Sequence, residues 1–404
     1  MNFLDYVTEQ KNTHMTHLED RVLYGGVNGT RQAIYVLRDL RHMLSGSGGK
    51  VNAKWDGAPA VFAGIDPSDG KFFVAKKGIF NKNPKVYKTP EDIDADTKGD
   101  LNKKLKEALK YLPELGIKGV VQGDFLYSRD DLKLKTIEKR KYVTFHPNTI
   151  VYAVPQEQAK QLLESKIGIV WHTSYTGKTF DTMTASFGVD ASKFKKSKNV
   201  WSTSSMLEFE PRARLTKSDS EEVKKILVEL GKLFNQVSGT TLRTLEAHPE
   251  LPQTIETFNN TFVRKGQMPG NSKAHVEKLI RYIKKKYKKE IDARKTEKGK
   301  GAQRKKLDNI LSFFSDENKQ SLIKMFEMQK LIVKAKIILI NKFNSLNKID
   351  TFVKTKDGYK TTGQEGYVAV DTLGGAVKLV NRMEFSYNNF SPNIVKGWES
   401  STRN

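Results

Sequence analysis

The sequence predicts an α+β protein in which a domain rich in antiparallel strands carries a large helical insertion. Between residues 50 and 180, short apolar or alternating segments are separated by turn residues, which is typical of strands. Residues 218–346 instead keep an apolar period close to 3.6, which is typical of amphipathic helices. Strand-like segments return after residue 350. Because the regular strand–helix alternation of a parallel sheet is missing, we expect antiparallel pairing.

Composition indicates a globular, basic protein. The chain has 404 residues, 37% of them hydrophobic, which suggests two to three domains with a sizeable core. Its formal net charge of +24 is spread over most of the sequence, so we expect a polyanionic partner, with nucleic acid ahead of a membrane surface. The absence of cysteine excludes disulfides, thiol catalysis and thiolate metal sites. No stretch of about 18 apolar residues occurs, and residues 1–6 do not resemble a signal peptide, so a cytoplasmic protein without membrane contact is expected.

The first 48 residues read as a helical segment. The apolar residues Leu18, Val22 and Leu23 start a helical period, which resumes after a glycine-rich break at residues 25–29. His14 and His17 are three positions apart and could share one helix face. Because no third ligand lies near them in the sequence, we expect surface residues here rather than a metal site.

The strand-rich segment begins at Lys50. Its expected strands are residues 51–53, 60–65, 71–75, 119–127, 142–145 and 149–154, with one helix at about 100–112. No glycine-rich phosphate loop of the Walker or dinucleotide type is present. Residues 181–215 are rich in Ser, Thr and Lys and predict a linking segment that contains one strand.

The helical insertion contains a basic run. Residues 273–306 hold many lysines, four of which, Lys284, Lys285, Lys288 and Lys289, fall on the outer side of one expected helix. The run could be a solubilising helix and loop, or a surface that contacts phosphates without reading sequence. Residues 299–301 predict a loop within it, and a further helix at about 317–346 is apolar enough to be buried on more than one face.

The last 55 residues supply three strands, at residues 350–353, 366–370 and 375–380. The most economical arrangement joins them to the sheet that begins at Lys50. The chain then divides into an N-terminal helical segment (1–48), a strand-rich domain (49–180 plus 350–404), and a linker with a basic helical insertion (181–349).

One tetrapeptide, Lys54-Trp55-Asp56-Gly57, joins the first two expected strands. A lysine held there between apolar residues can be partly desolvated, which favours the neutral amine that is able to attack phosphorus. A plain β-turn is the alternative interpretation of these four residues taken alone.

Six segments in order resemble the motifs of the covalent nucleotidyltransferase superfamily, which contains ATP-dependent DNA ligases, RNA ligases and mRNA capping enzymes. Lys54–Gly57 resembles the motif of the adenylated lysine. The others are Ala75–Gly78, Gln122–Leu126, Ile150–Val154, Glu365–Val368 and Val377–Val380. The resemblance covers residues 50–180 and 350–385. It implies an antiparallel-rich nucleotidyltransferase (ATP-grasp-like) domain with a large helical insertion and no C-terminal OB-fold, because only 26 residues follow Lys378.

The resemblance also implies roles for individual residues. Lys54 would attack the α-phosphate of ATP and form lysyl-AMP, with Asp56 and Gly57 shaping the nucleotide site. Lys378, with Lys76 or Lys77, would stabilise charge on that phosphate. The remaining implied roles are ribose or metal binding for Asp124, Mg²⁺ or Mn²⁺ binding for Glu365, and stacking on adenine for Tyr152 or, alternatively, Phe145.

Three positions depart from the family pattern: Pro59 follows the first motif, Asp124 replaces a glutamate, and Val380 replaces a second lysine. The absence of an OB-fold favours a phage-type polynucleotide ligase, with RNA ahead of DNA as its substrate. The alternatives are a non-catalytic nucleic-acid-binding protein with a degenerate fold, and a nucleotidyltransferase with another acceptor.

Overall fold

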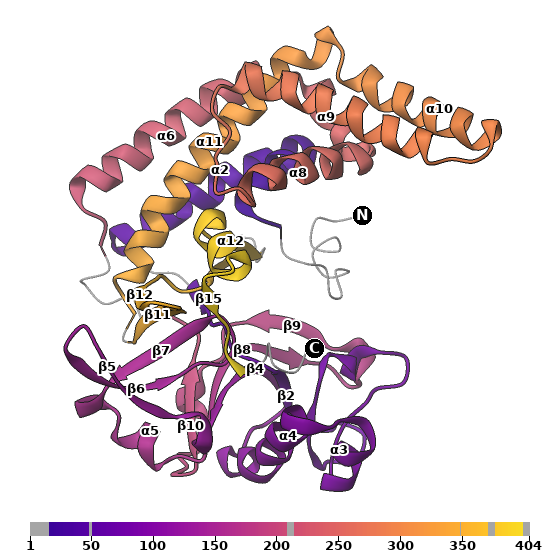
Figure 1. The fold of residues 1–404 in the computed structure, drawn as a ribbon. Coiled ribbons are helices and arrows are strands. Elements are labelled where there is room, and N and C mark those ends of the chain that lie inside the picture. Colours follow the sequence, from indigo (N-terminus) through magenta and orange to yellow (C-terminus); the bar gives the residue numbers. More distant parts are fainter. Residues whose placement is uncertain (1–15, 48–50, 208–213, 348, 371–375, 399–404) are drawn as a thin grey trace.

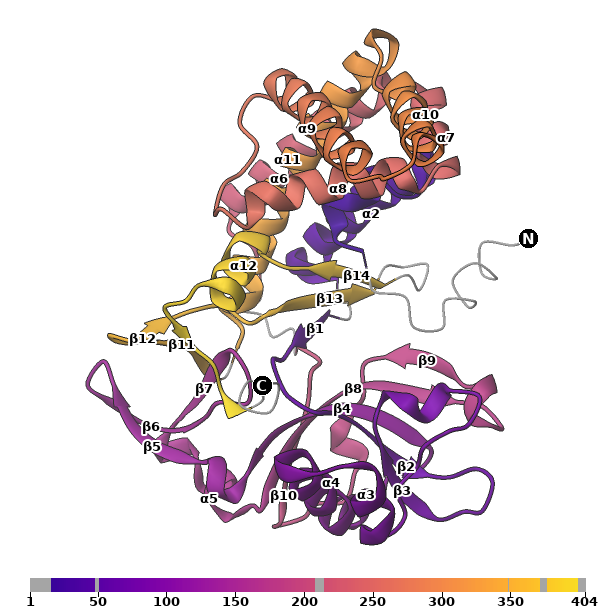
Figure 2. The same ribbon diagram turned by 45° about the vertical axis from the view of Figure 1, so that its right-hand side comes forward.

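A layer of helices lies over two mainly antiparallel sheets, and a small third sheet lies between them (Figures 1 and 2). The computed structural model describes residues 16–47, 51–207, 214–347, 349–370 and 376–398. The mixed helical and antiparallel architecture expected from the sequence is confirmed at this level. In the described part of the chain, no helix is both long enough and apolar enough to cross a membrane.

The first large sheet has the order β10 (Val200–Ser204), β8 (Ile167–Thr176), β4 (Val120–Ser128), β2 (Ala60–Ile65) and β3 (Phe72–Ala75), and β9 (Thr184–Phe187) pairs with β8. All of these pairs are antiparallel except β10 with β8. The helices α3 (Pro90–Asp96) and α4 (Gly99–Tyr111) share a hydrophobic core with this sheet. Leu105 and Ala108 of α4 are fully buried in that core.

The second large sheet has the order β12 (Gly358–Thr361), β11 (Asp350–Thr355), β7 (Ile150–Pro155), β6 (Arg140–Phe145) and β5 (Lys133–Ile137), and β15 (Ile394–Val395) pairs with β11. The small sheet consists of β1 (Val51–Lys54), β13 (Gly366–Val370) and β14 (Ala376–Leu379). C-terminal strands therefore pair with N-terminal ones, β11 with β7 and β13 with β1.

The helical layer contains α2 (Gly26–His42), α6 (Lys217–Gln236), α7 (Gly239–Ala247), α8 (Glu250–Val263), α9 (Ser272–Asp292), α10 (Glu297–Phe313) and α11 (Asp316–Asn344). As expected, α11 is buried along much of its length. The N-terminal helix α2 shares one hydrophobic core with α6, α11 and the small sheet. The prediction of a loop at residues 299–301 is wrong, because these residues belong to the first turns of α10. The amide of Gly299 there donates to the hydroxyl of the capping Thr296 at 3.1 Å.

A buried group of charges joins the helical layer to its neighbours. In the short helix η1 (Leu18–Val22), Glu19 pairs with Lys336 of α11 at 2.6 Å, and Asp20 pairs at 2.8 Å with Arg382, the first residue of α12 (Arg382–Phe390). Breaking a buried pair of this kind leaves an uncompensated charge, which is strongly destabilising. The pairs thus fix η1, α11 and α12 to one another.

His17 lies beside this charged group, so the expected surface position is wrong. Its backbone forms a parallel bridge with Lys378 of β14. Burial lowers the pKa of the His17 imidazole to about 3, against the opposing effect of Glu19. The ring is therefore neutral at physiological pH. His14 lies outside the described residues.

Candidate active site

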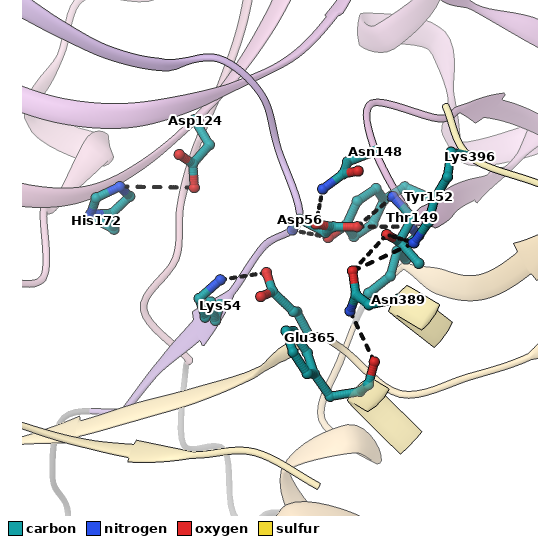
Figure 3. A network of polar contacts seen from close by, with 12 residues as sticks. Lys54, Asp56, Asp124, Asn148, Thr149, Tyr152, His172, Glu365, Asn389 and Lys396 are labelled. Carbon is teal, nitrogen blue, oxygen red and sulfur yellow. Dashed lines mark hydrogen bonds and ion pairs between the residues drawn. The ribbon is translucent and has the colours of Figure 1, made fainter. Parts of the chain in front are cut away.

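Lys54 and Glu365 face each other at one end of the neighbouring strands β1 and β13 (Figure 3). Lys54 is the last residue of β1, and its register partner is Gly366, the first residue of β13. Glu365 directly precedes that strand, and its carboxylate accepts a hydrogen bond from the Lys54 ammonium. Residues 311 positions apart in the sequence are thus joined by the antiparallel pairing of β1 with β13.

The ion pair decides the protonation state of Lys54. Burial lowers the pKa of the amine, but the Glu365 carboxylate, with smaller contributions from Asp124 and Asp56, raises it above its ordinary value. The sequence-based expectation of a neutral amine is therefore wrong for this arrangement. Lys54 is an ammonium as long as Glu365 remains its partner.

Lys378 joins the same electrostatic group from the neighbouring strand β14. It is paired in register with Val368 of β13. Burial, and then the positive charge of Lys54, lower the pKa of Lys378, while Glu365 acts in the opposite direction. The structure therefore joins Lys54 and Glu365 in an ion pair and places Lys378 on the next strand but one, close enough for their charges to act on it. Val380, which replaces the second lysine of the family motif, is fully buried and packs so closely on Gly366 that a Cβ there would lie 2.4 Å from a Val380 methyl.

Gly57 allows β4 to approach the turn after Lys54. A Cβ at Gly57 would lie 2.6 Å from the Cβ of Asp124 and 3.0 Å from the carbonyl oxygen of Phe125. The turn is fixed there by two hydrogen bonds, from the Ala58 amide to the Phe125 carbonyl at 2.9 Å and from the Phe125 amide to the Pro59 carbonyl at 3.0 Å. Asp124 is consequently held near enough to Lys54 to raise the pKa of its amine (Figure 3).

His172 is a neighbour of Asp124 that sequence reasoning missed. Its Nε2 lies 3.8 Å from an Asp124 carboxylate oxygen, and its Nδ1 lies 2.7 Å from the hydroxyl of Thr173. It lies on β8 where the pairing with β4 shifts register, between Trp171 and Thr173. No sequence signal marks it, because the irregularity arises from tertiary strand pairing.

Asp56 anchors the turn to the second large sheet. Its carboxylate accepts hydrogen bonds from the Asn148 side chain at 2.9 Å and from the amides of Thr149 and Ile150 at 2.6 and 2.9 Å. Its own amide donates to the Tyr152 hydroxyl at 2.6 Å. Burial, followed by the Glu365 carboxylate, raises the pKa of Asp56 to about 7, while the two backbone donors act in the opposite direction. These contacts make Asp56 a positioning residue for Lys54 instead of the expected nucleotide contact.

Tyr152 does not have the open face that stacking on adenine requires. The ring is fully buried. Trp55 stacks on it with centroids 4.7 Å apart, and Phe145 stacks on it at 5.3 Å. The Tyr152 role expected from the resemblance is corrected accordingly: its hydroxyl holds the backbone of Asp56. Phe145, the alternative candidate, is likewise 1% exposed.

The lysines of the second motif lie apart from this group. Lys76 forms an ion pair with Asp96 at the end of α3, at 2.9 Å. Lys77 is exposed in the short helix η3 (Lys77–Phe80). Within the described ranges neither lysine takes part in the Lys54–Glu365 ion pair, so the expected contribution of this motif to the phosphate site is not seen.

The carboxylates of Asp124 and Glu365 are the candidate metal ligands. Among the described residues, no group of three or more His, Asp or Glu side chains is arranged as a metal site. Two carboxylates near Lys54 nevertheless fit Mg²⁺ or Mn²⁺, because Mg²⁺ is commonly held by one or two carboxylates together with substrate phosphates and water.

The helix α9, which carries the basic residues, lies in the helical layer, away from β1 (Figure 2). The helix buries Val276, Leu279 and Ile283 and exposes Lys284, Lys285, Lys288 and Lys289. None of these four lysines forms an ion pair with a carboxylate of the described residues. They therefore present uncompensated positive charge to solvent.

Comparison with known proteins identifies a family and no characterised relative. No curated protein matches the chain, and no solved structure matches it. The model of one family, described as a family of unknown function (DUF6267), matches residues 12–394. Because that match covers nearly the whole sequence, the chain belongs to this family.

Proposed function

We propose that the protein is an ATP-dependent polynucleotide ligase that acts through adenylation of Lys54, with RNA favoured over DNA as its substrate. The observation that carries the proposal is the convergence of Lys54, Glu365 and Lys378, which come from three separate motifs. A chance resemblance between short segments would not require an ion pair between Lys54 and Glu365 with Lys378 within electrostatic range of both.

In the proposed first step, Nζ of Lys54 attacks the α-phosphorus of ATP. A nitrogen–phosphorus bond forms, the bond from that phosphorus to the oxygen bridging to the β-phosphate breaks, and pyrophosphate leaves. The proton lost by the amine can pass to Glu365, which already accepts a hydrogen bond from it. AMP is then transferred to a 5′-phosphate, and a 3′-hydroxyl displaces it to join the ends.

The surrounding charges suit a reaction at phosphate. Lys378 carries the positive charge that would stabilise the oxygens of the α-phosphate. Asp124 and Glu365 would hold Mg²⁺ or Mn²⁺, which supplies further neutralisation of phosphate charge. Because the ion pair keeps Lys54 protonated, the amine becomes a nucleophile only after it has transferred a proton to Glu365.

Nucleic acid is the proposed partner because of the charge distribution. The net charge of +24 and the four exposed lysines of α9 provide contacts to phosphates that do not depend on base sequence. Such contacts hold a polynucleotide without selecting its sequence.

Two observations favour a non-catalytic nucleic-acid-binding protein instead. Both faces of Tyr152 are covered, and Lys76 is committed to Asp96. A protein that kept a degenerate nucleotidyltransferase fold but no longer bound a nucleotide would tolerate both features. A nucleotidyltransferase with another acceptor would also begin by adenylating Lys54. A test of this adenylation therefore does not distinguish it from a ligase, and its acceptor has to be identified separately.

The test is incubation of the pure protein with α-labelled ATP and Mg²⁺, followed by denaturing electrophoresis. Wild type should retain label in an acid-labile, alkali-stable bond, as a phosphoramidate does. Lys54→Ala should retain none, whereas Lys82→Ala, which removes an exposed lysine of the loop after η3, should label like wild type. Circular dichroism of each variant establishes that it is folded.

Absence of label from folded wild type with either ATP or GTP would refute adenylation and leave the binding-protein alternative. Label that persists in Lys54→Ala would assign the chemistry to another residue. If only wild type and Lys82→Ala are labelled, RNA and DNA with 5′-phosphate ends are then added in separate reactions. The polynucleotide that receives the labelled AMP is the acceptor.

A further inference from the structure

A cleft of about 880 Å³ lies behind the strand that carries Lys54. Ala53 and Trp55 line it, whereas Lys54 does not, because neighbouring side chains of an extended strand point to opposite faces. One wall is formed by the chain from η8 (Ala191–Lys193) through β10 to Leu207, and the other by residues that follow α11. The cleft is thus separate from the Lys54–Glu365 group but shares β1 with it.

Two lysines make the rim of the cleft basic. Lys195 and Lys196 are both exposed, and neither forms an ion pair with a carboxylate in the described part of the chain. The backbone of Lys195 is held by the Leu115 carbonyl at 2.9 Å, and its aliphatic stem packs on Gly116, 3.1 Å from where a Cβ would lie. The ammonium group is therefore carried on an ordered stem at the edge of the cleft.

Asp190, the acidic residue among those that line the cleft, already has hydrogen-bond and charge partners. The carboxylate of Asp190 accepts hydrogen bonds from the amide and hydroxyl of Ser192, at 3.1 and 2.6 Å, and lies 3.8 Å from Lys193. Its charge is offset by Lys193, and the nearby Glu114 carboxylate accepts hydrogen bonds from Ser197 and Asn199. In the described part of the chain neither carboxylate is paired with Lys195 or Lys196. An anionic ligand matches this rim.

Inside the cleft, the lining is aromatic and polar. Trp55 stacks on Tyr152 and also lines the cleft. Gln364 lines it too; the residue is 9% exposed, and its Oε1 is a buried acceptor without a hydrogen-bond partner among the described residues. A ligand with a planar ring and an N–H donor would satisfy both residues.

We infer that this cleft holds a segment of single-stranded polynucleotide, with backbone phosphates at Lys195 and Lys196 and a base at Trp55 and Gln364. Phosphate charge and a stacking aromatic are the two elements of single-strand recognition. A duplex keeps its bases stacked internally and offers none to Trp55. The inference rests on the proposed function for the class of substrate, and it adds the place where a strand would be held beside β1.

The test is fluorescence anisotropy with labelled single-stranded RNA and DNA of about 12 nucleotides, within the usual range of single-strand site sizes, and a duplex of the same length. The double variant Lys195→Glu/Lys196→Glu is compared with Lys135→Glu/Lys141→Glu. The control pair changes the net charge equally, on exposed residues of β5 and β6.

The cleft variant should bind single strands at least about tenfold more weakly than the control. Because two phosphates are then no longer neutralised, its log–log salt slope should become about 1.4 smaller in magnitude. Trp55→Leu should also weaken binding by about tenfold, and Trp55→Phe should restore most of it because an aromatic face remains. Equal affinities of the cleft and control variants would overturn the proposal, as would a wild type that binds duplex as tightly as single strands.

Self-labelling at Lys54, measured without nucleic acid, separates this proposal from the proposed function. The cleft variant should label normally, since its substitutions lie on the other side of β1. Absence of labelling in wild type would refute adenylation while the binding experiment still decides the role of the cleft.

Discussion

The charge state of Lys54 depends on one side chain, Glu365. Because that carboxylate is the strongest of the groups that raise the pKa of Lys54, Glu365→Gln should lower it, and burial should then move the pKa below its ordinary value. The measurement is the pH dependence of the rate at which a small amine-reactive reagent acylates Lys54, followed by mass spectrometry. The midpoint should move to lower pH in the variant.

Asp130→Asn serves as the matched control, since it removes an exposed acid that pairs with Lys103. An unchanged midpoint for Lys54 in Glu365→Gln would show that the ion pair does not govern this amine. The proposed proton transfer to Glu365 would then have no basis.

His17 predicts a specific decrease of stability in acid. The folded protein keeps the imidazole neutral down to a pKa of about 3, whereas the unfolded chain binds a proton near pH 6.5. Between these values the unfolded state binds more protons, so the free energy of unfolding falls as the pH falls. At pH 4 the decrease due to His17 amounts to about 3 kcal/mol.

Urea unfolding at pH 7 and pH 4 checks this value. The decrease in stability should be smaller by that amount in His17→Gln, while His42→Gln, at an exposed position, should behave like wild type. Equal decreases in wild type and His17→Gln would show that the ring is solvated in the native state.

At the scale of elements, the turn between β1 and β2 has no room for a side chain at Gly57. Gly57→Ala should destabilise the protein by about 1–3 kcal/mol, because the new methyl would overlap Asp124 or the Phe125 carbonyl. Gly231→Ala is the matched control: Gly231 is within α6 with open space around it, so the substitution should stabilise by about 0.5–1 kcal/mol. Thermal unfolding of both variants measures the difference, and a neutral Gly57→Ala would contradict the close packing.

The elements that the sequence predicted well are those with one buried face. The strand expected at residues 60–65 is β2, and the expected helix at 100–112 is α4 within one residue. Two of the missed strands lack such a pattern: Lys133–Thr136 in β5 and residues 184–186 in β9 are exposed on both faces. The strand β8 was also missed, although residues 167–171 are all buried, because a short continuous apolar run does not show the alternation that marks a half-buried strand. The helix α12 was missed because only two of its residues, both polar, are buried.

Some residues of the candidate site could be predicted from the sequence and others could not. Lys54, Glu365 and Lys378 could be named because they occupy motifs whose order is visible in the sequence. The covered faces of Tyr152 and the contact between His172 and Asp124 depend on sheet packing and on a register shift, which no local pattern encodes. The protonation of Lys54 could not be predicted either, since its partner is distant in the sequence.

For the whole molecule, positive charge should govern binding to polyanions. The combined substitution of Lys284, Lys285, Lys288 and Lys289 by glutamate should weaken binding of single-stranded oligonucleotides. The log–log salt slope should become smaller in magnitude by about 0.7 for each phosphate that is no longer neutralised. Anisotropy titrations over a range of salt concentrations measure the slope.

Four substitutions at the exposed residues Lys217, Lys224, Lys225 and Lys232 of α6 provide the control, because they change the net charge by the same amount. This variant should keep a salt slope closer to that of wild type. A slope that is the same in the two variants would exclude α9 as a specific contact surface.

The pairing of β1 has a consequence for how the chain is made. Lys54 is synthesised well before its partners, because β1 is bordered by residues 366–369 and by the Ser205 carbonyl, and Glu365 lies 311 positions further along. Contacts of such long sequence separation form late, because the intervening chain must first be ordered. An incomplete translation product that ends before residue 365 can contain the strands β2 to β10 and the helices α2 to α11, but it cannot contain the Lys54–Glu365 pair. The environment of this lysine is thus assembled only in chains whose synthesis has passed β13.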